Sequence, residues 1–146
     1  MDPKELARLI TGIIERVEQF IPHYMENEEE DRKKAAGGIA ICILDQDGRV
    51  YGKMFGTDKI MMRERYRVAW MKASQVWITG IKTGEFERLV FNKEIDEGKF
   101  GIKRPDYIGW EGGQPITLKD GTVLAVGFSG FRSATDLDII LKALPQ

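Results

Sequence analysis

Basic residues between positions 63 and 72 are the part of this sequence best suited to binding an anion. Arg63 and Arg67 are four residues apart, as on one face of a helix, and Arg65 shares a second face with Lys72. Guanidinium groups bind carboxylates and phosphates through paired hydrogen bonds, so these residues predict a site for a small anionic ligand. The alternative is a solvated helix surface whose charge is offset by Glu64.

A glycine-rich segment from 108 to 113 provides a second group of candidate residues. Gly112 and Gly113 would let successive backbone N–H groups converge on an anion, and Trp110 offers a flat stacking surface. The alternative is a strained turn that leads into a strand at Pro115. The glycine spacing matches neither the dinucleotide nor the phosphate-loop fingerprint. Near a subunit boundary, the predicted site combines the following residues: Trp110, Gly112, Gly113, Arg63, Arg67 and Lys72.

The single histidine, His23, is the only imidazole available to a metal or a haem iron. If a helix continues past Pro22, His23 and Glu26 lie on one face of it; the alternative is an exposed histidine beside a helix kink. Cys42 lies inside the apolar run Ile39–Leu44 and is predicted to be a buried, unreactive thiol. One cysteine also excludes an intrachain disulfide and a multi-cysteine metal site.

Length and composition indicate one globular domain spanning residues 1–146. The net charge of -1 gives no general attraction for nucleic acid, so no nucleic-acid partner is expected. No apolar stretch approaches the roughly 20 residues needed to cross a bilayer, so no membrane partner is expected either. The first residues lack the pattern of a signal peptide, which predicts a cytoplasmic protein.

Apolar residues spaced three and four apart predict three helices, at residues 1–21, 58–79 and 134–144. Pro22 should end or kink the first helix. The charged stretch 23–34 is then either a solvated helix or a mobile connector. Ser133 should cap the last helix, with Leu141 among its inward-facing residues. In the second helix, Trp70 and Trp77 suit an interface, a core or a flat ligand pocket.

Two Asp-Gly turns predict two β-hairpins, and therefore an antiparallel sheet. The first joins Ile39–Leu44 to residues 49–56, and the second joins a short apolar run at 116–118 to Val123–Phe128. Gly127 should mark a place where a helix or a ligand comes close to the backbone. Residues 82–110 look mainly like a loop, with a short strand possible at 89–91.

These motifs, in this order along the chain, resemble the GlcG/HbpS-like family, which includes the PduO C-terminal domain. The resemblance is carried by Gly112–Ile116, by Ala125–Gly130 with Asp136 in the following helix, by Lys72-Ala73, and by the first strand running into Asp45-x-x-Gly48. It implies a profilin-like α+β domain with a five-stranded antiparallel sheet, helices packed against it, and assembly into homodimers or larger homo-oligomers. Some family members bind or degrade haem, and others accompany cobalamin or glycolate metabolism.

The leading hypothesis is therefore a protein that binds a small anionic or aromatic ligand as a homo-oligomer. A haem or other tetrapyrrole ligand, with His23 as the candidate iron ligand, follows from the resemblance alone. An enzyme acting on haem or a small metabolite is a second hypothesis, and its candidate proton carriers are His23, Lys72, Glu111 and Asp136. A scaffold protein that docks a partner on the tryptophan-rich helix is a third.

Overall fold

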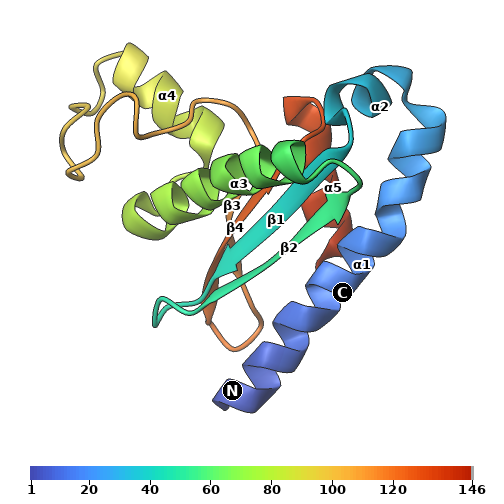
Figure 1. The fold of residues 1–146 in the computed structure, drawn as a ribbon. Helices are drawn as coiled ribbons and strands as arrows, with labels where there is room; N and C mark the ends of the chain where they lie inside the picture. Colours follow the sequence, from blue (N-terminus) through green and yellow to red (C-terminus); the bar gives the residue numbers. More distant parts are fainter. Residues whose placement is uncertain (146) are drawn as a thin grey trace.

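The computed structural model describes residues 1–145, which form five helices and four strands (Figure 1). In chain order these are α1 (Pro3–Asn27), α2 (Glu29–Ala35), β1 (Gly38–Leu44), β2 (Val50–Gly56), α3 (Lys59–Thr79), α4 (Thr83–Phe91), β3 (Gly113–Thr117), β4 (Val123–Ser129) and α5 (Ser133–Ala143). None of the helices in this range is both long enough and apolar enough to cross a membrane.

The two predicted hairpins form one antiparallel sheet of strand order β2-β1-β4-β3. The strands β1 and β4 pair at its centre, where Cys42 lies between Gly52 and Gly127. The expected five-stranded sheet is wrong, because residues 1–145 form four strands. The short strand predicted at 89–91 lies in α4, whose Phe86 is fully buried against Phe100 and Tyr107.

The two faces of the sheet carry side chains of different size. Because strand residues alternate between faces, Ile41 and Ile43 point to one face and Ala40 and Cys42 to the other. The large residues pack against α1 and α5, whereas the small ones pack against α3. In Figure 1, α3 lies on the opposite side of the sheet from α1. The helix α3 therefore lies closer to the sheet than side chains of ordinary size would allow. Gly127 faces a packed helix, one of its two predicted neighbours.

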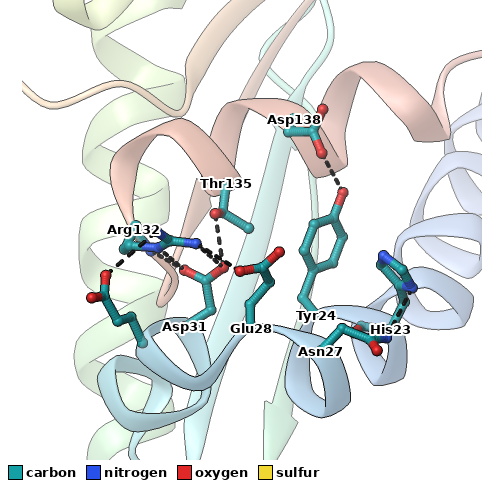
Figure 2. A network of polar contacts seen from close by, with 9 residues as sticks. His23, Tyr24, Asn27, Glu28, Asp31, Arg132, Thr135 and Asp138 are labelled. Atoms are coloured by element: carbon teal, nitrogen blue, oxygen red, sulfur yellow. Dashed lines mark hydrogen bonds and ion pairs between the residues drawn. The ribbon is translucent and has the colours of Figure 1, made fainter.

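The prediction that Pro22 ends the first helix is wrong, because α1 runs through it to Asn27. A proline inside a helix removes one backbone hydrogen bond at a cost of about 3 kcal/mol. Packing beyond the proline offsets this cost. Tyr24 is buried against Phe131 and donates a hydrogen bond to Asp138 (Figure 2).

The charged stretch 23–34 is neither wholly solvated nor a free connector, because Asp31 in α2 is fully buried. Its carboxylate accepts hydrogen bonds from the Arg132 backbone N–H at 2.9 Å and from the Thr135 hydroxyl at 2.8 Å (Figure 2). Asp31 thereby caps α5 from outside. The prediction that Ser133 caps this helix is wrong, since α5 has no side-chain cap of its own. Leu141, predicted to face inward, is exposed.

Candidate functional site

A cavity of about 400 Å³ lies between α3, the N-terminal end of α5 and the segment that precedes β3. Its charged lining residues are Lys34, Glu64, Arg65, Arg67, Lys72 and Asp136, and Trp110 lies at its edge. We call it the basic cavity, because its lining carries four cationic side chains and two acidic ones. One of the two acidic groups, Glu64, is already paired with Arg67 by two hydrogen bonds.

The helix α3 supplies six of the residues that line the basic cavity, and its residues 65, 68 and 72 lie on one helical face. Asp58 caps the start of the helix, accepting hydrogen bonds from the backbone N–H groups of Ile60 and Met61. Arg65 is held in place because its Nε atom donates to the Gly38 carbonyl oxygen at 3.2 Å. The arginines therefore project from a helix that is fixed at both its cap and its sheet contact.

The irregular segment over the cavity is fixed by two polar side chains. Gln75, which is buried in α3, exchanges hydrogen bonds with the backbone N–H and carbonyl of Ile108 at 2.6 and 3.0 Å. Thr83 donates to the Trp110 carbonyl oxygen and accepts from the Gly113 N–H. Sequence reasoning missed Gln75. The available signal was a polar residue on the buried stripe of α3, beside Ala73 and Val76.

An ion pair closes the inner end of the basic cavity. Lys72 and Asp136 are only 2% and 3% exposed, and the Lys72 Nζ atom lies 3.2 Å from Asp136 Oδ2 and 2.8 Å from the Phe128 carbonyl oxygen. The other carboxylate oxygen of Asp136 accepts the Phe131 N–H. Burial lowers the pKa of Lys72, although Asp136 opposes this. Burial also raises the pKa of Asp136 to about 7, against the effect of Lys72.

The structure brings together three of the predicted site residues, because Arg67, Lys72 and Trp110 all line the basic cavity. Gly112 and Gly113 instead line a neighbouring cavity of about 270 Å³. Arg63 is exposed on α3 and is not part of the cavity lining.

His23 lies on the other side of the sheet from α3. It is exposed on α1, beside Asn27 (Figures 1 and 2).

The glycines of the predicted site make room for the protein's own atoms. A Cβ atom at position 112 would lie 2.7 Å from Lys72 Nζ and 2.8 Å from the Phe128 carbonyl oxygen. At position 113 it would overlap Thr83, and at position 130 it would overlap Ile39. The spaces beside these glycines are therefore occupied by packing contacts.

An apolar groove of about 610 Å³ adjoins the basic cavity and shares Arg67 and Met71 with it. The exposed side chains of Trp70, Trp77 and Ile78 line it, at 46%, 48% and 44% exposure. The predicted buried thiol is confirmed, because Cys42 is fully buried behind α3 and burial raises its pKa to about 11.

Comparison with known protein families identifies the chain. The family model described as "Haem degrading protein HbpS-like" matches residues 25–145. The chain belongs to the HbpS-like family. No curated protein matches the sequence closely enough to count as a relative.

Solved structures share the fold of this HbpS-like chain at low sequence identity. The structure of Klebsiella pneumoniae protein ORFY is 17% identical, with a TM-score of 0.67 over 94% of this chain and 86% of that one. A PduOC protein solved as a haem complex is 18% identical, with a TM-score of 0.61 over 99% and 92% of the two chains. Ybr137w protein is 17% identical, with a TM-score of 0.62 over 98% and 75%. At these identities the likeness establishes the fold alone.

The haem that the family description implies can be tested against the side chains of this HbpS-like chain. The basic cavity offers cations for its carboxylates, and the apolar groove offers tryptophans for its ring. Where the two meet, the Met71 thioether is of a type that can bind haem iron. The lining of neither space contains histidine, so His23 could reach an iron there only from another subunit.

Proposed function

We propose that this HbpS-like protein binds a small amphipathic ligand across the basic cavity and the apolar groove. The supporting observation is that the two spaces meet on α3, at Arg67 and Met71. An apolar body would pack on the exposed tryptophans while its acidic groups pair with Arg65 and Arg67. Haem or another carboxylated tetrapyrrole is the candidate ligand, because the family description names haem and a protein of the same fold was solved as a haem complex.

A haemin titration followed by absorbance tests the proposed site. Arg67→Ala should weaken binding about tenfold, because a charge-assisted hydrogen bond contributes roughly 1.5–3 kcal/mol. Arg63→Ala is the matched control, since it removes an arginine from the same helix outside the cavity lining. If Arg67→Ala and Arg63→Ala lose the same amount of haemin affinity, the ligand binds on the exposed surface of α3 instead. No change of the haemin spectrum in the unmodified protein would eliminate haem as the ligand.

The same titration with His23→Ala decides the predicted role of the only histidine. An unchanged haem spectrum would show that His23 does not bind the iron. A changed spectrum would mean that a neighbouring subunit supplies the histidine, because within one chain it lies across the sheet from the basic cavity.

We also propose that the protein is a homo-oligomer in which a second subunit covers the apolar groove. Half-exposed tryptophans beside an apolar space are typical of interfaces. Ile78→Glu, inside the groove, should reduce the native mass to that of the monomer, because a charge would be buried at the interface. Ile60→Glu is the control, since Ile60 lies on the same helix outside the groove lining and is 79% exposed. A native mass that is unaffected by Ile78→Glu would contradict this proposal.

An enzymatic function is a second candidate, favoured by one observation. Lys72 and Asp136 are buried together in a cavity, and burial shifts the pKa values of both toward neutrality, as in many acid–base pairs. Of the other two predicted proton carriers, Glu111 is exposed and lines the neighbouring smaller cavity, and His23 is exposed on α1. Turnover of haem that is lost in Asp136→Asn while haem binding persists would support the enzyme.

A further inference from the structure

The lining of the basic cavity carries more positive than negative charge. Its charged side chains come from three elements: Lys34 from α2, Glu64, Arg65, Arg67 and Lys72 from α3, and Asp136 from α5. The segment before β3 and the turn between β4 and α5 add no charged side chain to the lining. With Glu64 committed to Arg67, Asp136 is the acidic group that an anion entering the inner end would meet.

Lys72 retains capacity for one further hydrogen bond. Its ammonium group has three N–H donors, and two acceptors in the described chain contact it, the Phe128 carbonyl oxygen and Asp136. The carboxylate of Asp136 is likewise fixed at both oxygens, by Lys72 and by the Phe131 N–H. The remaining donor of Lys72 suits one oxygen of a carboxylate or phosphate group.

We propose that the acidic group of the ligand binds against Lys72 at the inner end of the basic cavity, and that Asp136 takes up a proton as it binds. This inference rests on the proposed ligand site and adds to it both the recognised chemical group and its control by pH. A bound oxyanion and an ionised Asp136 would share one ammonium in a buried space, and two like charges there repel. Protonating Asp136 removes that repulsion and leaves the charge of Lys72 to the ligand.

The pKa of Asp136 in the free protein sets the pH range in which the affinity for the ligand should change. Burial already raises the pKa of Asp136 to about 7, and a bound anion would raise it further. The complex therefore holds more protons than the free protein above pH 7, and its affinity falls as the pH rises, by up to about tenfold per unit. Well below pH 7 both forms are protonated, so the affinity is constant.

Titrations with acetate and with sulfate, followed by protein NMR at pH 6, 7 and 8, test this proposal. Both probes keep their charge in this range, and they separate a carboxylate site from a phosphate-like one. The affinity of the preferred probe should fall by up to about fivefold from pH 7 to pH 8, because half of the free protein already carries the Asp136 proton at a pH equal to its pKa of about 7. In Asp136→Asn this fall should be smaller, because Lys72 is then the titratable group left at the inner end of the cavity. Lys34→Gln should lower the affinity for both probes, because it removes a positive charge from the cavity lining.

An affinity that does not change with pH in the unmodified protein, or a dependence on pH that is undiminished in Asp136→Asn, would overturn the proposal. If Asp136→Asn fails to fold, the pKa of Asp136 can be measured directly by carbon NMR in the unmodified protein. It must rise when the probe is added, and an unchanged value would overturn the proposal. If acetate or sulfate binds but haemin does not, haem is rejected as the ligand and the present inference stands. If haemin binds but neither acetate nor sulfate perturbs the basic cavity, the present inference is rejected and haem stands as the ligand.

Discussion

Replacing Gly127 with alanine should be among the most destabilising single substitutions in this protein. The added Cβ atom would overlap the Ala69 carbonyl oxygen and lie 2.7 Å from the Ala73 nitrogen. Both are backbone atoms of α3, so no side-chain rotation relieves the contact, and the helix must move away from β4. Overpacking of this kind costs about 3 kcal/mol, a large share of the roughly 5–15 kcal/mol that stabilises a typical domain.

Urea and thermal unfolding check this prediction. A loss of about 3 kcal/mol corresponds to a fall of about 10 °C in Tm for a chain of this size. Gly12→Ala in α1 is the control, because its Cβ would meet nothing closer than the end of the Arg16 side chain at 3.4 Å. It should raise stability by roughly 0.5–1 kcal/mol, as alanine does in place of glycine within helices. Comparable stabilities for Gly127→Ala and the unmodified protein would disprove the close packing of α3.

Replacing Asp31 with alanine should cost about 3 kcal/mol and should also weaken ligand binding. Asp31 accepts the Arg132 N–H, two hydrogen bonds from the Arg132 guanidinium and one from the Thr135 hydroxyl (Figure 2). Its removal leaves the N-terminal end of α5 uncapped. Gly130 and Phe131, which precede that end, line the basic cavity, so the cavity wall should loosen as well.

Glu30→Ala provides the matched control for Asp31→Ala. Glu30 contacts the same guanidinium at 3.4 Å, but it is 77% exposed, so its loss should cost less than about 0.5 kcal/mol. If the two variants are equally stable, Asp31 does not anchor α5.

The contribution of Asp31 to the unfolding free energy should also depend on pH. Burial alone would raise the pKa of Asp31, but the hydrogen bonds from Arg132 and Thr135 outweigh it and hold the pKa below the ordinary value of 3.8. A lowered pKa contributes stability above that ordinary value, and the contribution is lost as the pH falls through the folded-state pKa. The gap in unfolding free energy between the unmodified protein and Asp31→Ala should therefore narrow below about pH 4. A gap that stays constant into acid would contradict the lowered pKa.

The hairpins and the long helices could be predicted because their signals are local. The turns at Gly48 and Gly121, the continuous apolar run of β1 and the helical spacing in α3 each depend on residues close together in sequence. The segment that became α4 shows the limit of this approach. A run of nine residues has a weak periodic signal, and the burial of Phe86 against Phe100 and Tyr107 decided its structure.

Some features of the site could likewise be predicted from the sequence, and others depend on the tertiary structure. The sequence alone determined that α3 carries a cluster of cations and that Trp110 precedes a glycine pair. Only the tertiary structure decided that Lys34 joins the cluster, that Gln75 fixes the segment above it, and that the glycines serve packing. It also placed His23 across the sheet. These outcomes depend on contacts between residues far apart in the chain. Such contacts form only when the helices pack on the sheet, so local sequence patterns do not predict them.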